Sequence, residues 1–95
     1  MKIFSFKADV RTAFNTCKRV LMDLDCEIEI ESCEQGIIEA KMPGSLFAYG
    51  YNITIKIKNS ELHIISETLG IQIIDWGTNK ENEDAIAQDI AKLLK

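Results

Sequence analysis

Few residues of this sequence have the types and spacing that catalysis or metal binding requires. His63 is the single histidine, and Glu39 and Glu67 are carboxylates that could flank it on one face of a β-sheet, although the spacing does not require this. An imidazole beside a carboxylate can transfer a proton near neutral pH. However, no second histidine is available as a metal ligand, and an open sheet face does not exclude water. We therefore keep His63 as a candidate site residue, and we expect no enzyme activity, no metal and no cofactor.

The three cysteines do not form an evident reactive site. Cys17 and Cys26 fall at positions that face the core in the elements predicted below, and Cys33 lies near a turn. An odd number of cysteines is typical of reduced thiols in an intracellular protein rather than of a disulfide framework. Cys33 has no cationic neighbour in the sequence that would activate its thiol, so we do not expect it to be reactive.

Two carboxylates form a second arrangement with chemical potential. Glu29 and Glu39 face each other across two predicted strands if the turn between them pairs Glu31 with Ile37. Close carboxylates perturb each other's ionisation, and active sites exploit this. The simpler interpretation is that water and Lys41 relieve the repulsion, and we prefer it.

Leu46, Phe47 and Trp76 are the candidate interaction residues. Leu46 and Phe47 follow a Pro-Gly-Ser turn and form an unusually apolar hairpin tip. If they are exposed, they suggest contact with a partner; alternatively, the loop folds back over the sheet end or beside Trp76. Trp76 lies in a segment that leads into a helix N-terminus, where anions can bind. The acidic residues that follow favour a structural interpretation, in which Trp76 closes the edge of the fold and Asn79 caps the helix.

These residues are positioned by a central hairpin over residues 49–68. Strict alternation of apolar and polar residues predicts two strands, each with one buried face and one wet face. Asn59-Ser60 provides a two-residue turn, which places Ile57 opposite Leu62 and Ile55 opposite Ile64. A slip by one residue would bury lysines, so we expect this register to be firm.

The remaining elements are predicted from periodicity and turn residues. A strand over residues 2–6 precedes a helix from Asp9, its N-cap, to about Asp23. Strands follow over residues 26–31 and 37–42, with Cys26, Ile28 and Ile30 facing the core. Residues 70–77 form either a short strand or an irregular crossing, and a last helix runs from about residue 80 to 94. The apolar stripes of the two helices are Val10, Ala13, Phe14, Cys17, Val20, Leu21 and Leu24 in the first, and Ile86, Ala87, Ile90, Leu93 and Leu94 in the second.

Length and charge limit the classes of protein to consider. Ninety-five residues make one domain, 1–95, with enough chain for a single core. No apolar run approaches the ~20 residues that span a bilayer, and Met1-Lys2 opens alternation rather than a signal peptide. We therefore expect a cytoplasmic protein without membrane association. The net charge of −4 argues against general binding to phosphate backbones.

The order of elements predicts an α+β two-layer sandwich. Hairpins make the sheet antiparallel in β-α-β-β-β-β-α order, and both helices cover one face. This order resembles the TATA-binding-protein-like fold in its single-repeat form. It is also similar to small bacterial domains of unknown function that share a Gly-Ile-Ile-Glu-Ala strand, here Gly36 to Ala40, and a late Asp-Trp-Gly-x-Asn step, here Asp75 to Asn79. The resemblance implies a fold and almost nothing about activity.

The open face of this sheet departs from the DNA-binding version of the fold. That version uses apolar wedges and basic residues, whereas here the predicted acidic residues outnumber the basic ones. We therefore expect no nucleic-acid partner. The charged residues predicted on this face are Glu27, Glu29, Glu31, Glu39 and Glu67 against Lys41, Lys56 and Lys58.

Two functions remain open at the level of sequence. The first is a non-enzymatic protein-interaction or self-association module, which contacts a protein partner or a second copy through an edge strand or through the Leu46-Phe47 loop. The alternative is a small-ligand-binding domain with a cleft between sheet and helices, lined by Tyr49, Tyr51, Met42 and Trp76.

Overall fold

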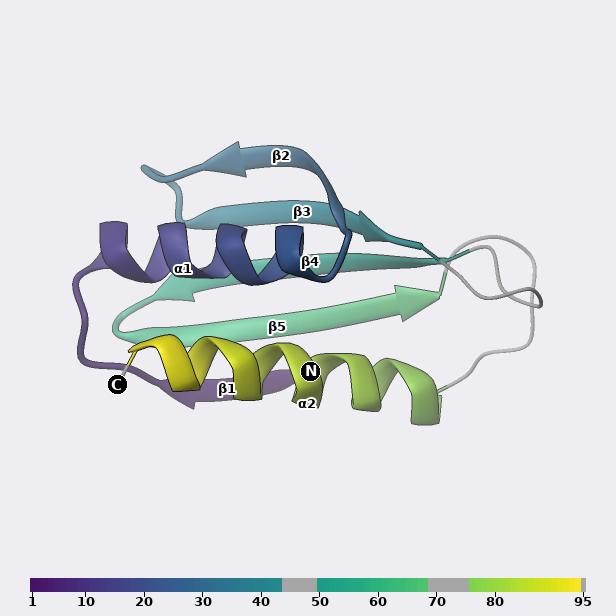
Figure 1. The fold of residues 1–95 in the computed structure, drawn as a ribbon. Coiled ribbons are helices and arrows are strands. Elements are labelled where there is room, and N and C mark those ends of the chain that lie inside the picture. The colour runs from purple at the N-terminus through teal and green to yellow at the C-terminus, as the bar shows by residue number, and fades with distance from the viewer. Residues whose placement is uncertain (44–49, 69–75, 95) are drawn as a thin grey trace.

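The computed structural model describes residues 1–43, 50–68 and 76–94 of the chain (Figure 1). Its elements follow the predicted β-α-β-β-β-β-α order, which confirms the α+β class. They are β1 (Lys2–Ser5), α1 (Val10–Asp23), β2 (Glu27–Ser32), β3 (Ile37–Met42), β4 (Tyr51–Lys58), β5 (Glu61–Thr68) and α2 (Trp76–Leu94).

The five strands form one antiparallel sheet in the order β1-β5-β4-β3-β2. The β4–β5 hairpin has the predicted register, with Ile57 opposite Leu62 and Ile55 opposite Ile64. Asn59 and Ser60 both have positive φ, 52° and 64°. Two positive φ values are the signature of the tight turn whose twist matches that of paired strands.

Both helices lie on the same face of the sheet, as predicted (Figure 1). α1 runs over the β2–β4 side and α2 runs beside β5 and β1, and the two helices also contact each other. Apolar side chains of the strands and helices meet between the two layers, where burial stabilises the fold. The fully or almost fully buried ones are Phe6, Ala13, Phe14, Cys17, Val20, Leu21, Cys26, Ile38, Ala40, Ile53, Ile55, Ile57, Leu62, Ile64, Ile86, Ala87 and Ile90.

Helix α1 begins where the sequence predicts. The Asp9 carboxylate Oδ1 accepts the main-chain N–H of Thr12 at 2.7 Å, which satisfies one of the free donors of the first turn. This hydrogen bond lowers the pKa of Asp9 below its usual 3.8. The expectation that Val10 joins the buried stripe is wrong, because its side chain is 48% exposed. Val10 is the first residue of the helix, and that turn lies at the end of the sheet (Figure 1).

Strand β2 contains a bulge that the alternating sequence did not indicate. Ile28 pairs with Ala40, but Ile30 pairs with Glu39, so one extra residue is inserted between the two pairs. After this insertion the faces exchange: Ile30 points away from the core and is 52% exposed. Glu31 points to the helix side, where its Oε2 lies 2.8 Å from Lys18 Nζ of α1. The predictions of an inward Ile30 and of an outward Glu31 are therefore wrong.

Helix α2 begins earlier than predicted. It starts at Trp76 rather than near Lys80, so Asn79 lies within the helix instead of capping it. For the same reason Glu81, Glu83 and Asp84 lie beyond the first turn of the helix. Lys92 lies in its last turn. The buried stripe runs along Ile86 and Ile90 toward Leu94. Leu93 lies beside this stripe and is 48% exposed, so the prediction that it is buried is wrong. The extra turn brings polar residues of α2 against β5.

Gly36 occupies a position that glycine alone suits, in the turn between β2 and β3. Its φ is +64°, and its carbonyl accepts the Ile57 main-chain N–H at 2.7 Å. A Cβ atom at this position would lie 2.6 Å from the Ile57 carbonyl oxygen, which no ordinary contact allows. The β2–β3 turn is thereby held against the end of β4.

Candidate functional site

The face of the sheet opposite the helices is not covered by any described element (Figure 1). Alternation along the strands and the pairing register place residues of both charges and four isoleucines on this face. We call it the open face. Its residues include Ile3, Ile30, Ile37, Glu39, Lys41, Asn52, Thr54, Lys56, Lys58, Glu61, His63, Ile65 and Glu67.

His63 lies on the open face, as predicted, and pairs with Lys56. Its Nε2 atom is 3.5 Å from Oε1 of Glu61, and its side chain is 25% exposed. The two candidate carboxylates lie elsewhere on the sheet, since Glu39 pairs with Thr54 and Glu67 pairs with Asn52. The carboxylate that contacts His63 is thus one that the spacing argument did not consider.

The Glu29–Glu39 arrangement does not form. The register pairs Ser32 with Ile37 and Glu31 with Ile38, not Glu31 with Ile37, and the bulge places Ile30 opposite Glu39. Glu29 instead lies 3.3 Å from the Lys41 ammonium. This exposed ion pair relieves repulsion on the open face but contributes only about 0–1 kcal/mol.

Isoleucines on the open face lie near its two lateral edges. On β1 and β5, Ile3 is 45% exposed and Ile65 is half-buried. On β2 and β3, Ile30 is 52% exposed and Ile37 is half-buried. The strip between them carries polar side chains from β4, such as that of Thr54. The open face therefore carries apolar groups toward both lateral edges and polar groups between them.

The predicted interaction residues fall largely outside the described part of the chain. Leu46 and Phe47 lie outside the described residues, as do residues 70–75 of the segment 70–77 that was expected to form a strand or a crossing. Residues 76 and 77 of that segment belong to α2 instead. Trp76 is the first residue of α2, and its side chain is likewise outside the described part. Of the residues predicted to line a cleft, Met42 and Tyr51 pair with each other and are half-buried against the core.

The cysteine thiols are suited to packing rather than to chemistry. Burial raises the pKa of the Cys17 thiol to about 12. Burial, and to a smaller extent the charge of Asp25, also raises the pKa of Cys26. Cys33 is partly buried and packs against the core. A thiol that stays protonated is a poor nucleophile and a poor metal ligand, so Cys17 and Cys26 contribute no reactive group.

A polar hollow lies between β5 and α2, on the helix side of the sheet. Its three buried polar residues are Ser66 on the strand and Asn79 and Glu83 on the helix, with 6%, 8% and 6% exposure. The hollow measures about 620 Å³, which falls within the ~300–1,000 Å³ of small-molecule sites. Its described lining consists of Met1, Lys2, Ile65, Ser66, Asn79, Lys80, Glu83 and Asp84.

Hydrogen bonds connect the buried polar residues into one network. The Ser66 main-chain N–H donates to Glu83 Oε2 at 2.9 Å, and the Ser66 hydroxyl donates to Asn79 Oδ1 at 2.7 Å. Asn82 Nδ2 donates to the same hydroxyl at 3.4 Å. The second Glu83 oxygen, Oε1, lies 3.0 Å from the amine of Met1. Within the described part of the chain, no buried side-chain nitrogen or oxygen lacks a partner, so the network holds these groups in fixed positions.

Sequence reasoning missed this hollow, although a signal was present. Stepping back along α2 from Ile90 by four, three and four residues gives Ile86, Glu83 and Asn79. The buried stripe of the helix thus continues into polar residues. Ser66 likewise continues the inward series of Leu62 and Ile64 on β5. Polar residues at buried positions on two facing elements predict a polar contact between those elements.

Among the described residues, no group of three or more His, Cys, Asp or Glu side chains is arranged to hold a metal ion. None of the helices in this same part of the chain is long and apolar enough to cross a membrane.

Comparisons with known proteins do not assign the chain to a family. No model of a known protein family matches the sequence, and a search of curated proteins finds no match.

Proposed function

We propose that the protein is a non-enzymatic interaction module whose contact surface is the open face of its sheet. The observation that carries this proposal is the exposure of Ile3 and Ile30, 45% and 52%, on a face that no described element covers. Burying exposed isoleucine side chains against a partner removes apolar surface from water. The charged residues between them then select the partner and its orientation.

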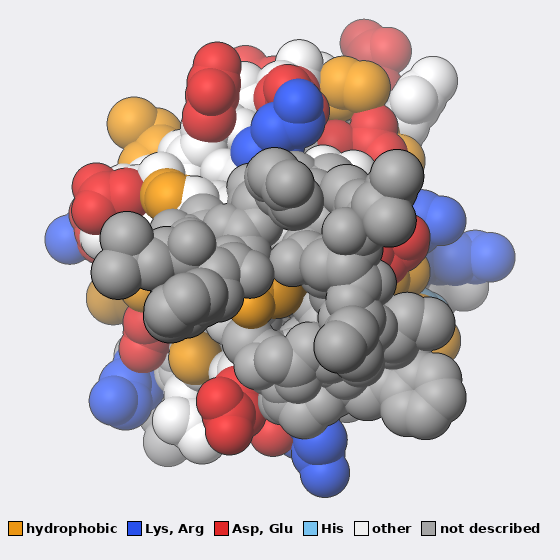
Figure 2. Space-filling view, turned by 90° about the vertical axis from the view of Figure 1, so that its right-hand side faces the viewer, with side chains coloured by type: hydrophobic (Ala, Val, Ile, Leu, Met, Phe, Trp, Pro, Cys, Tyr) orange, Lys and Arg blue, Asp and Glu red, His pale blue; other side chains and the backbone are white. Residues whose placement is uncertain are grey.

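The chemistry of the face favours a protein partner over a nucleic acid. Its lysines stand among carboxylates, as at the ion pair of Lys41 with Glu29, so it offers no continuous basic track for phosphates. Figure 2 shows acidic and basic side chains interspersed around one end of the molecule as well. A protein surface with apolar groups and charges of both signs complements such a face, whether it belongs to another protein or to a second copy.

Site-specific photo-crosslinking tests this function. A photoreactive residue at Thr54, in the middle of the open face, is compared with one at Arg19 on α1, both in expressing cells. Arg19 is a matched exposed control, since its side chain is 71% exposed. We expect a protein adduct from position 54 that weakens when Ile30 is replaced by lysine, and none from position 19. Equal labelling at both positions, or none at position 54, would contradict the proposal.

We also propose that the domain has the single-repeat TATA-binding-protein-like topology. Three features support this: the β-α-β-β-β-β-α order, the strand order β1-β5-β4-β3-β2, and the placement of both helices on one face.

A second candidate function is the binding of a small ligand in the polar hollow. The specific observation in its favour is a 620 Å³ space beside three buried polar side chains, those of Ser66, Asn79 and Glu83. Small-molecule sites orient their ligands with a small number of fixed polar groups, and these three side chains offer such groups. This location differs from the cleft predicted from the sequence, because neither Met42 nor Tyr51 belongs to its described lining.

A further inference from the structure

The polar hollow begins where β5 extends beyond β1. The β1–β5 pairing runs from Ser5 opposite Glu61 to Lys2 opposite Ile64, whereas β5 continues to Thr68. In an antiparallel ladder, alternate residues direct both main-chain groups toward the same neighbouring strand. The Phe6 N–H donates to the Ser60 carbonyl, so the main chains of Ser60, Leu62, Ile64 and Ser66 all face the β1 side.

At Ser66, the Glu83 side chain supplies the hydrogen-bond acceptor that a neighbouring strand would otherwise supply. The Ser66 N–H, which faces the β1 side, donates to Glu83 Oε2 at 2.9 Å instead of to a strand carbonyl. The carboxylate is almost fully buried, with 8% of the side chain exposed. A buried carboxylate needs hydrogen-bond donors or a cation to offset the loss of its hydration. Oε2 obtains a donor from the strand, and Oε1 is directed into the hollow.

An ammonium group already occupies the Oε1 side. The Met1 amine lies 3.0 Å from Glu83 Oε1, and the Met1 side chain remains 48% exposed. A charge-assisted hydrogen bond of this kind is short, directional and about twice as strong as a neutral one. The site therefore accepts a primary amine sterically, with room beside it for the group that the amine carries.

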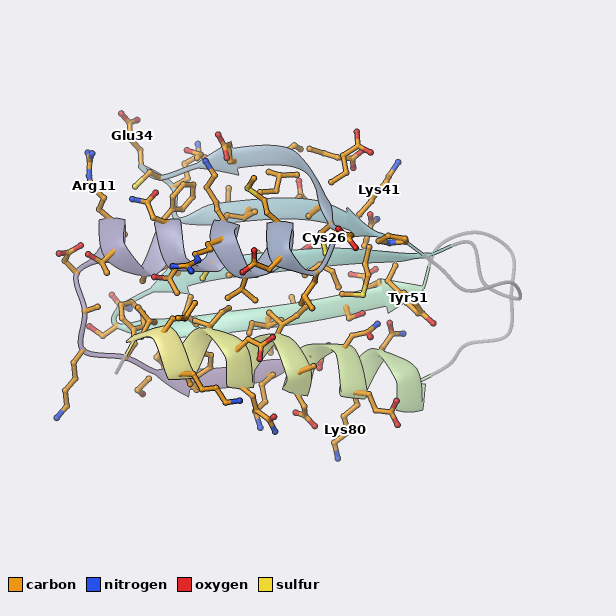
Figure 3. The ribbon with its side chains drawn as sticks, in the orientation of Figure 1. Arg11, Cys26, Glu34, Lys41, Tyr51 and Lys80 are labelled. Atoms are coloured by element: carbon orange, nitrogen blue, oxygen red, sulfur yellow. The ribbon has the colours of Figure 1, made fainter. Side chains whose placement is uncertain are left out.

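The other charged groups at the hollow leave the position beside Glu83 Oε1 to a single cation. Lys2 Nζ lies 3.5 Å from Asp84 Oδ1, so these two charges compensate each other at the rim. Lys80 belongs to the lining but is exposed, and Figure 3 shows its side chain extending outward from α2. Glu83 is thus the buried anion of the hollow, and Ser66 and Asn79 line the space next to it.

We propose that the hollow between β5 and α2 is a binding site for a primary ammonium group, which Glu83 holds through Oε1. The amine has two sources, Met1 of the chain itself or a free small amine. This inference rests on the second candidate function and specifies its ligand class. Because the Met1 amine is tethered at a high effective concentration, it competes with a free amine.

Binding of small probes to two forms of the chain tests the proposal. The chain is prepared unmodified and with an acetyl group on the Met1 amine, which removes the tethered cation. Each form is titrated with propylammonium, propionamide and propionate, and amide NMR signals of Ser66 and Asn79 report occupancy. We expect propylammonium to shift these signals at lower concentration in the acetylated form, and we expect propionamide and propionate to leave them unchanged.

Matched variants separate a role of the carboxylate from a loss of folding. Glu83→Gln keeps an acceptor for the Ser66 N–H, so the fold is retained, and thermal unfolding verifies this. We expect it to weaken propylammonium binding by about tenfold or more. Glu81→Gln, on the exposed side of the same helix, leaves binding unchanged. Equal binding by the wild type and Glu83→Gln would overturn the proposal.

The probe panel also distinguishes failure of this inference from failure of the second candidate function. If propionamide or propionate shifts the Ser66 signal and propylammonium does not, the ammonium inference fails while a ligand-binding hollow stands. If none of the three probes shifts it in either form of the chain, both fail. If propylammonium shifts it equally in both forms, the site takes a free amine without competition from Met1.

Discussion

The carboxylate of Glu83 accepts the main-chain N–H of Ser66 across the gap between α2 and β5, at 2.9 Å. A side chain seventeen residues away thus completes the hydrogen bonding of a strand beyond the point where its neighbour β1 ends. Helix α2 is thereby fixed to the sheet by a directional polar contact as well as by the apolar stripe of Ile86 and Ile90.

Replacement of Glu83 by alanine is expected to destabilise the protein. It leaves the buried Ser66 N–H without an acceptor, which costs about 1–3 kcal/mol. The measurement is the free energy of unfolding from denaturant titration. Glu81→Ala is the control at an exposed position of the same helix, with an expected change within about 0.5 kcal/mol. Similar values for both variants would show that the Glu83–Ser66 contact does not stabilise the fold.

The bulge in β2 is tested by two matched isoleucine substitutions. Ile28→Thr affects a side chain packed against the core, and we expect it to cost about 1–2 kcal/mol. Ile30→Thr affects a side chain that is 52% exposed, and we expect a change within about 0.5 kcal/mol. Chemical denaturation measures both. A regular strand without a bulge would instead give both variants the same large cost.

The Asp9 N-cap of α1 is expected to make the stability of the folded protein sensitive to acid. The pKa of Asp9 in the folded protein is lowered from 3.8, chiefly by the hydrogen bond from the Thr12 N–H. The stabilisation is therefore complete above about pH 4 and is lost as the pH falls through the folded-state pKa. Asn at this position caps the helix without titrating. We expect the stability difference between wild type and Asp9→Asn to shrink toward acid pH; a constant difference would refute the assignment.

Thiol labelling is expected to follow burial. Cys17 is fully buried, and its pKa is raised to about 12, so a haloacetamide reagent at about pH 8 does not reach a thiolate there. Cys33 is the most accessible of the three thiols, and we expect it to be alkylated first. Mass spectrometry of digests, with a sample labelled in denaturant as the control, gives the order. Labelling of Cys17 as fast as Cys33 in the native protein would contradict the packing described here.

The parts of the fold that the sequence predicts best are those in which local pattern and long-range packing agree. The β4–β5 register follows from alternation and from the Asn59-Ser60 turn, because any slip would bury lysines such as Lys56. The bulge in β2 is different. Residues 26–31 alternate without interruption, so nothing local marks an inserted residue, and the exchange of faces shows only in contacts such as that of Glu31 with Lys18.

The start of α2 and the polar hollow illustrate the same limit. Gly77 and Thr78 are unfavourable in a helix, so local propensity places the start after them, near Lys80. The helix nevertheless includes them, and tertiary packing places Asn79 and Glu83 against Ser66. Each of these polar residues lay at a core-facing position in its own element. The contact of Asn79 and Glu83 with Ser66 depends on how α2 is placed relative to β5, and the periodicity within a single element gives no information about that placement.

The bulge in β2 has a further consequence for how copies of the chain meet. β2 is an outermost strand, and an outermost strand offers unpaired main-chain groups to any extended segment that approaches it. The inserted residue interrupts that row of main-chain groups, so an extended segment cannot pair regularly along the whole edge. The β2 edge is thereby a poor template for fibril-like stacking of one sheet edge on another.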